Sequence, residues 1–288
     1  MTVTDHLSSR LAPDELWELV QPHLPPFRPR PQGGGTAPLP DRQVFTAIVY
    51  ALASGCAWRD LPPSSGVPFQ TAHRRFARWT KAGVWPGLHR ALLDELGSQG
   101  LTRLVPRHRR RRLRAGEKGG ALTGPGPVDR GKPGSKIHAL SDRGGLPLSA
   151  ALSAANTHDS LALKPLVRAV PAIRSRRGPR RRRPGKLHAD KAYDQAGLRA
   201  WVRGRRIAVR IGRRGIETGD RLGRHRWVIE RTLAWLTGYR RLTLRYERNP
   251  SHFLAFLTLA ATIACYKKLT KCTTRDKLLA SAGLTIVP

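Results

Sequence analysis

Two acidic residues lie where an ordered chain could use them for chemistry: Asp190 in the string LHADKAYD and Glu230 in the string HRWVIERTLAWL. The apolar pattern predicts a short strand just before Asp190 and a helix around Glu230. A carboxylate past a strand end and another on a later helix can converge on Mg²⁺, which prefers oxygen ligands. Two such ions can clamp the attacking and leaving oxygens of a phosphoryl transfer. Each carboxylate could instead be structural, Asp190 as a cap and Glu230 as the partner of Arg226 or Arg231.

The elements that must position these carboxylates alternate between strand and helix. Two expected strands form a hairpin around the turn Asp142-Arg143-Gly144-Gly145. The expected strands cover 136–141, 146–153, 186–189 and 206–211, and the expected helices cover 160–170, 195–203, 224–236 and 253–268. This order predicts an α/β fold with helices flanking a mixed sheet.

Basic residues dominate the composition: 53 Lys and Arg against 19 Asp and Glu give a formal net charge of +34 in 288 residues. An excess this large points to a polyanionic partner such as nucleic acid. The three cysteines lack metal-ligand spacing, which argues against a zinc finger or a disulfide scaffold. No apolar signal core opens the sequence, and the apolar run 253–266 is shorter than the ~20 residues that span a bilayer. We therefore expect a cytoplasmic, nucleoid-associated protein with no membrane partner.

The N-terminal part predicts a bundle of helices with one basic face. Expected helices cover 42–54, 69–82 and 86–96, after a short helix that prolines interrupt near 22. In the helix 69–82, Phe76 and Trp79 should point inward. The cationic side chains of this helix should point outward: Arg74, Arg75, Arg78 and Lys81. This all-α layout is typical of a helix-turn-helix, whose cations reach phosphates and base edges, although the solvated face of any small bundle would look the same.

Four strings resemble transposases of insertion-sequence family five, within the large DDE group. They are GPGPVDRGKPGSKIHALSDRGGLPL, AANTHD, LHADKAYD and RWVIERTLAWLTGYRRLTLRYER, and they follow the family's order and spacing. The likeness covers 118–268, and the N-terminal part with SGCAWRDLP is similar to the family's helical DNA-binding region. The resemblance implies a ribonuclease-H-like domain that cuts and joins double-stranded DNA at the terminal inverted repeats of an insertion element. It also implies a homo-oligomer on that DNA.

In this family three acidic residues bind two Mg²⁺ (or Mn²⁺) ions. The resemblance assigns Asp190 to the second Asp of the family and Glu230 to its Glu. Tyr193 matches the aromatic of an Asp-x-x-Tyr motif. Asn156 and Asp159 match a motif after the third strand, where they would form a turn and cap a helix, or support the metal site from behind.

The family's basic positions are only partly kept. Arg226 matches the basic residue four positions before the Glu. The Lys or Arg that often follows the Glu by seven residues is Thr237 here, and Arg240 or Arg241 could replace it on the DNA.

The first Asp of the family is missing. It should lie on the opening strand, shortly before Lys118-Gly119-Gly120, but the string RHRRRRLRAGE stands there. Residue alignment puts Arg109 at the Asp position. One explanation is a frameshift: codons for Val-Asp-Ala-Val-Ser-Val-Arg, read in a shifted frame, would give the Arg-Arg-Arg-Arg-Leu-Arg-Ala found here. In that alignment Arg110 stands over the lost Asp. The alternative is ordinary divergence of a basic linker. So many charges would make a poor buried strand, and two carboxylates alone should bind metal weakly.

Two other carboxylates could fill the gap. Asp129 lies in a Pro/Gly-rich loop, and Asp142 lies at the hairpin turn, where we expect the sheet end away from the site. Three functions therefore remain open: a working transposase, a catalytically dead DNA-binding relic or repressor, and a basic RNA-binding protein. We expect a helical region over 1–97, a basic linker or disrupted first strand over 98–117, a catalytic domain over 118–270 and a loose tail over 271–288.

Overall fold

The computed structural model describes most of the chain. The described residues are 7, 9–27, 38–102, 104, 107–114, 120–127, 130–213 and 219–281. For 107–114, 219–226 and 275–281 only the backbone is described. Asp129 therefore lies outside the described residues.

The N-terminal helices form largely where the sequence predicts them. They are α2 (Asp14–Val20), α3 (Asp41–Ser54), α4 (Phe69–Lys81) and α5 (Val84–Ser98). The predicted stop of α3 is confirmed, because Gly55 takes the left-handed conformation with φ 71°. A Cβ on Gly55 would also lie only 2.8 Å from the Cβ of Arg240, so glycine is needed for both reasons.

A six-stranded mixed sheet confirms the α/β prediction. Its strands are β1 (Arg107–Arg114), β2 (Gly124–Pro125), β3 (Pro133–Ser141), β4 (Pro147–Ala154), β5 (Lys186–Ala189) and β6 (Ala208–Ile211). They are ordered β4-β3-β1-β5-β6, with the short β2 paired to β3. The β1, β3 and β4 strands pair antiparallel, whereas β5 pairs parallel to both β1 and β6.

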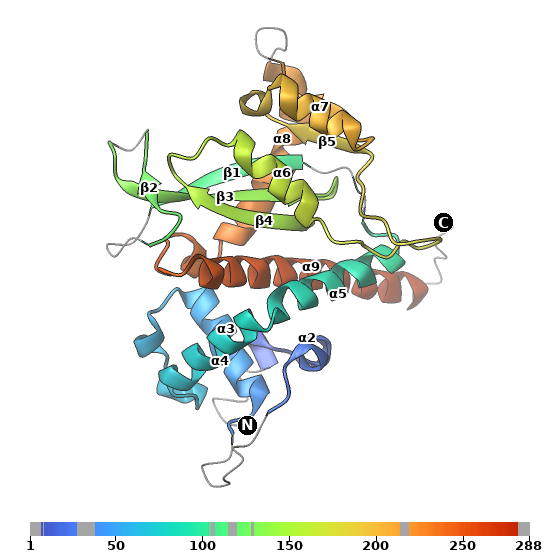
Figure 1. The fold of residues 1–288 in the computed structure, drawn as a ribbon. Coiled ribbons are helices and arrows are strands. Elements are labelled where there is room, and N and C mark those ends of the chain that lie inside the picture. Colours follow the sequence, from blue (N-terminus) through green and yellow to red (C-terminus); the bar gives the residue numbers. More distant parts are fainter. Residues whose placement is uncertain are drawn as a thin grey trace.

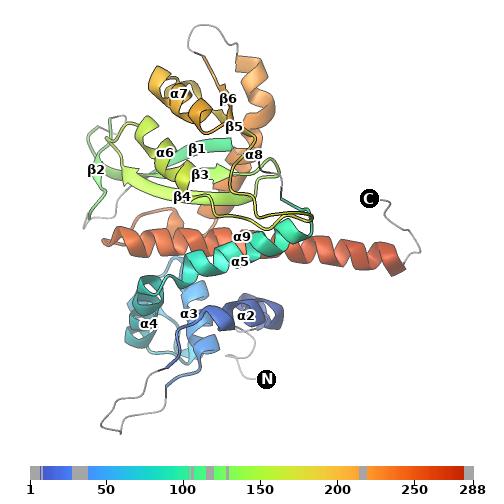
Figure 2. The ribbon, with the colours of Figure 1, turned by 45° about the vertical axis from the view of Figure 1, so that its right-hand side comes forward.

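Helices cover both faces of the sheet (Figures 1 and 2). On one face, α6 (Ser160–Ala169) and α7 (Ala196–Gly204) share a buried apolar cluster with β5. On the other face, α8 (Gly219–Thr237) packs against β1 and β3. Of the two expectations for 98–117, a basic linker or a disrupted first strand, the structure has a strand over 107–114, which is the central strand β1.

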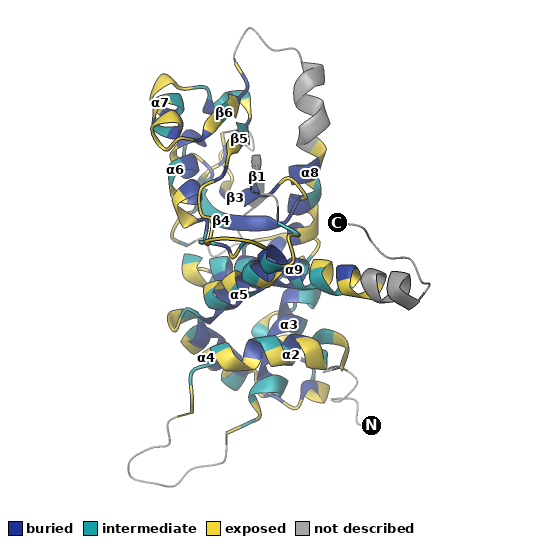
Figure 3. Cartoon of the chain, turned by 90° about the vertical axis from the view of Figure 1, so that its right-hand side faces the viewer, coloured by how far each residue is buried: buried dark blue, intermediate teal, exposed yellow. Residues whose placement is uncertain are grey.

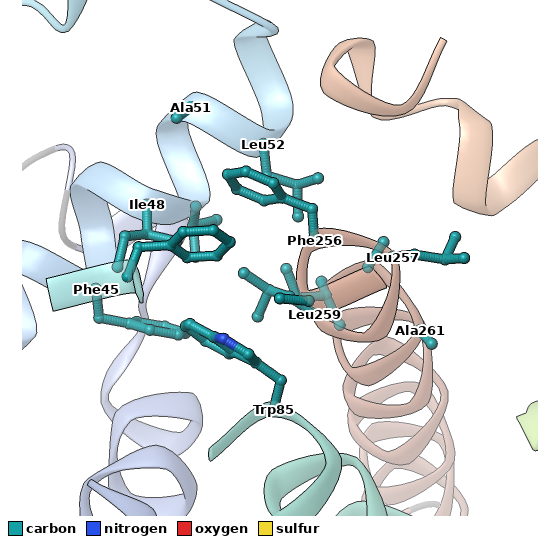
Figure 4. Packing of buried hydrophobic residues seen from close by; sticks show 14 of the residues in the cluster. Phe45, Ile48, Ala51, Leu52, Trp85, Phe256, Leu257, Leu259 and Ala261 are labelled. Atoms are coloured by element: carbon teal, nitrogen blue, oxygen red, sulfur yellow. The ribbon is translucent and has the colours of Figure 1, made fainter. Parts of the chain in front are cut away.

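The helix α9 (Pro250–Ser281) joins the N-terminal helices to the sheet. Phe256, Leu259 and their neighbours pack against α3 and Trp85 (Figure 4), and the same cluster reaches Ile137 and Ala139 of β3. The expected boundary at 97 is therefore no division in packing. The expected tail from 271 is helical as far as Ser281, because α9 continues to that residue.

The apolar part of α9 is longer than the sequence suggested. Over Pro250–Thr274 it is long and apolar enough to cross a membrane, but 61% of its most apolar window is buried inside the protein. Figure 3 shows α9 passing α5, with both buried and exposed residues along the coloured part of the helix. Burial on this scale is typical of a core helix, and it explains the apolar run without a membrane.

Candidate functional site

The central strands bring the position of the missing Asp next to Asp190. The β1 and β5 strands are parallel neighbours, with Arg107 opposite His188. Continuing this register by two residues brings position 109 level with Asp190, the first residue after β5. Neighbouring strands lie ~4.8 Å apart. The backbone therefore places positions 109 and 190 side by side.

Burial along the strands identifies the face of the sheet to which these positions belong. Leu187 and Ala189 of β5 pack with α6 and α7, so the alternate position, Asp190, falls on the opposite face. On β3, Ala139 packs on the α8 side and pairs with Arg109. Directly opposed residues of an antiparallel pair share a face. By register, positions 109 and 190 therefore both fall on the face that α8 covers.

Both expected catalytic carboxylates are exposed. Asp190 accepts a hydrogen bond from the Lys191 backbone N–H at 2.6 Å and caps the 3₁₀ turn Lys191–Tyr193. Glu230 is exposed on α8, beside the buried Ile229. Among the described residues, no group of three or more His, Cys, Asp and Glu gathers closely enough to hold a metal ion. The shared metal site of Asp190 and Glu230 stays a prediction.

The expected supporting residues have defined structural partners. Tyr193 is buried in the cluster beneath α6 and α7. Asp159 is buried and pairs with Lys136 Nζ at 3.0 Å, and Lys136 Nζ also donates to the Thr157 carbonyl at 2.6 Å. Asp159 makes no capping hydrogen bond to α6, so that prediction is wrong, because its carboxylate is turned toward Lys136. Asn156 is exposed in the turn after β4.

The cationic residues of α4 divide into two groups. Arg74, Arg78 and Lys81 are exposed, as predicted. Arg75 is buried, and its Nη1 lies 2.8 Å from Asp41 Oδ1, so its predicted outward orientation is wrong. The physical reason is its place on the inner stripe of the helix, one residue before Phe76 and one turn before Trp79.

The basic residues after Glu230 also differ in burial. Arg240 is exposed, whereas Arg241 is buried and lies 2.5 Å from Glu247 Oε1. Thr237 is buried and donates to the Leu233 carbonyl at 2.9 Å, so it does not extend toward a ligand. The side chain of Arg226 lies outside the described residues.

Asp142, the other carboxylate considered for the gap, has a structural role. It is fully buried, and its Oδ1 accepts a hydrogen bond from the Leu146 backbone N–H at 2.8 Å, which closes the β3–β4 turn. It lies beyond Ser141, which pairs with Arg107 at the start of β1, so its turn is several residues from the level of Asp190.

The sequence is similar to known proteins of insertion elements. Residues 12–89 match the family "Putative transposase of IS4/5 family", and residues 105–265 match "Transposase DDE domain". A "Putative transposase for insertion sequence element IS402" of Burkholderia cepacia is 40% identical over 193 residues, which are 67% of this chain and 92% of the relative.

An "Insertion element IS402 uncharacterized 16.2 kDa protein", also of Burkholderia cepacia, is 44% identical over 85 residues, which are 29% of this chain and 58% of that relative. The DDE match spans more than half of the chain and includes β1, Asp190, Glu230 and the first half of α9. With an IS4/5 match over α2 to α4 preceding it, the chain belongs to the DDE transposases of the IS4/5 type.

Proposed function

We propose that this chain binds the double-stranded ends of an insertion element but does not cut them as its sequence stands. The observation that carries the proposal is the register of β1 and β5, which puts position 109 beside Asp190. An arginine occupies this position, where the family resemblance requires the first of three acidic residues. The strand order, three antiparallel strands followed by two parallel ones, supports a ribonuclease-H-like fold for the domain.

The residues present do not fit a two-metal site. Asp190 and Glu230 would supply two carboxylates, and the residues between Glu95 and Glu117 contain no third. Each carboxylate of such a site neutralises part of the charge of the cations, so an arginine in place of an aspartate adds repulsion where attraction is needed. Asp190 and Glu230 alone would bind one Mg²⁺ or Mn²⁺ weakly.

DNA binding is supported by exposed charge on the N-terminal helices. Arg74, Arg78 and Lys81 are exposed on α4, and Arg78 Nη2 is steadied by the Pro26 carbonyl at 2.8 Å. Arg240 adds an exposed cation after α8, and Arg226 is retained from the family motif. Arg75 and Arg241 are committed to buried ion pairs, so we assign them no DNA contact. Two ends per element favour a homo-oligomer on the DNA.

The test compares binding and cutting on the same DNA. We expect the chain to shift a duplex carrying its element ends in a gel, and to leave that duplex intact in Mg²⁺ or Mn²⁺. Arg74→Ala, Arg78→Ala and Lys81→Ala together should weaken binding and lower the salt slope by about 3, from ~0.9 per phosphate contact. Cleavage by the unmodified chain that disappears in Asp190→Ala would refute the proposed loss of activity.

A further inference from the structure

A groove between α8 and α9 combines aromatic and cationic side chains. It encloses about 700 Å³ beside the β3–β4 turn, within the usual size of ligand sites. Its principal lining residues are Arg231, Trp235, Tyr239, Lys267, Lys268 and Lys271. Arg231, Trp235 and Tyr239 lie within the family string around Glu230, but they are not among the positions to which the resemblance assigns a role. None of the six belongs to the exposed cations of α4, so the groove is distinct from the sites described above.

The α8 wall of the groove is a stack of one arginine between two tryptophans. The Arg231 guanidinium lies 4.6 Å from the Trp227 ring centre and 4.8 Å from that of Trp235. The three residues are four positions apart, so they share one face of the helix. Arg231 Nη2 also donates to the Gly144 carbonyl at 2.9 Å, which fixes the guanidinium.

The two indoles remain open to solvent although they are held in place. Trp227 is 53% exposed and Trp235 is 46% exposed. Burying a large aromatic side chain is energetically favourable. Such side chains held at a surface are therefore typical of a site that a ligand covers. Trp235 faces the groove, so it offers an aromatic surface to a ligand there.

The α9 wall supplies positive charge. Lys267, Lys268 and Lys271 are exposed on this helix, and Lys267 Nζ lies 6.0 Å from the Tyr239 ring centre. Among the described residues that line the groove, none is acidic. In a chain with net charge +34, a second copy brought here would meet like charge, whereas a polyanion would be attracted.

We propose that the α8–α9 groove binds an unpaired DNA strand, with a base stacked on Trp235 and phosphates beside Lys268 and Lys271. Duplex DNA presents its backbone and base edges but hides its base faces, whereas a single strand offers a base face to an aromatic platform. Arg231 directly follows Glu230 on α8, so the groove uses the same stretch of this helix as the proposed catalytic carboxylate. The inference goes beyond the proposed function, because strand binding does not require that the chain cuts DNA.

Fluorescence anisotropy of the full chain with a labelled single-stranded oligonucleotide, and with the matching duplex, tests the groove. We expect Trp235→Ala to weaken single-strand binding about 5- to 150-fold, the range for loss of one stacked base. Duplex affinity should change less than twofold. Lys268→Ala with Lys271→Ala should lower the single-strand salt slope by about 1.4, from ~0.7 per phosphate contact.

Matched variants separate the groove from general charge and folding. Trp201→Ala removes an indole that also has cations around it but lies outside the groove. Lys164, Arg168 and Arg205 approach its ring on the α6–α7 side. We expect Trp201→Ala to bind the single strand like the unmodified chain, and Trp235→Phe to keep most of the affinity. Single-strand affinity that is unchanged in Trp235→Ala would overturn the proposal. So would losses of single-strand affinity in Trp201→Ala and Trp235→Phe that are as large as the loss in Trp235→Ala.

Two further outcomes are decisive. If Trp235→Ala converts an oligomer into a monomer without changing single-strand affinity, the groove is an interface between copies and the proposal fails. If duplex end binding fails in the unmodified chain while Trp235-dependent single-strand binding persists, the proposed function fails and this inference stands.

Discussion

Removing the Glu247 carboxylate should strongly destabilise the fold. Arg241 and Glu247 pair at 2.5 Å, and their side chains are only 4% and 10% exposed. Arg241 also donates to the Cys56 carbonyl, and its guanidinium lies 5.2 Å from the ring centres of both Trp58 and Phe256. One residue therefore ties the loop after α3, the turn after α8 and the start of α9 together.

The magnitude follows from leaving this guanidinium buried without its counter-charge. Glu247→Met conserves approximate volume and should lower the free energy of unfolding by about 3–5 kcal/mol, the usual cost of removing one partner of a buried pair. Arg241→Met combined with Glu247→Met should be less destabilised than Glu247→Met alone, because no charge then stays buried. Urea denaturation of the two single variants and the double variant gives the comparison.

A loss below about 1 kcal/mol in Glu247→Met would refute this reasoning, since it would mean that Arg241 can reach solvent. In that event Arg241 would return as a candidate DNA contact. A double variant less stable than Glu247→Met would show that the ring contacts and the Cys56 carbonyl bond outweigh the ion pair.

Two further predictions concern α5. Burial lowers the pKa of His89 from 6.5 to about 4. The contribution of neutral His89 to stability is therefore fully present above pH 6.5. As the pH falls from 6.5 to 4, the free energy of unfolding should decrease by about 3 kcal/mol, because the unfolded chain binds the proton first. His89→Gln should flatten this part of the stability profile in urea titrations, and an unchanged slope would contradict the assignment. Gly97→Ala should lower the free energy of unfolding by about 1–3 kcal/mol, because the added Cβ would lie 2.0 Å from the Arg174 carbonyl oxygen. Gly87→Ala is the control: its Cβ would lie 3.6 Å from His23 Nδ1, so it should not lower the melting temperature.

Local patterns predicted the elements well where the physical signal was also local. Lys186–Ala189 forms β5 with the predicted bounds, and α3 begins one residue before its predicted start. Apolar periodicity and glycine stops are properties of a few neighbouring residues, so they can be recognised in one sequence. The position of Asp190 directly after β5 could be predicted from the same local pattern.

Partners that are far apart in the sequence could not be predicted. Arg75 resembled its exposed neighbours, but Asp41 of another helix holds it inside. Arg245, which sequence reasoning missed, is buried and bonds Ser135 Oγ at 2.7 Å and Thr123 Oγ1 at 2.9 Å. Residue type alone favours exposure for arginine, and only the fold supplies the distant acceptors. The apolar cluster that joins the residues before and after 97 is also a distant contact, because α9 supplies the face that both parts share.

The register of β1 also chooses between the two positions for the missing carboxylate. Arg109 pairs with Ala139, which packs on the α8 side, whereas Arg110 pairs with His138 on the alternate face. Arg109→Asp should therefore raise Mn²⁺ affinity in calorimetry by about tenfold or more, ~1.4 kcal/mol, and restore cutting of element ends. Arg110→Asp makes the same change of charge one residue away and should restore neither. Rescue by Arg110→Asp alone would mean that the strand is shifted by one residue relative to the register described here, as the frameshift alignment requires.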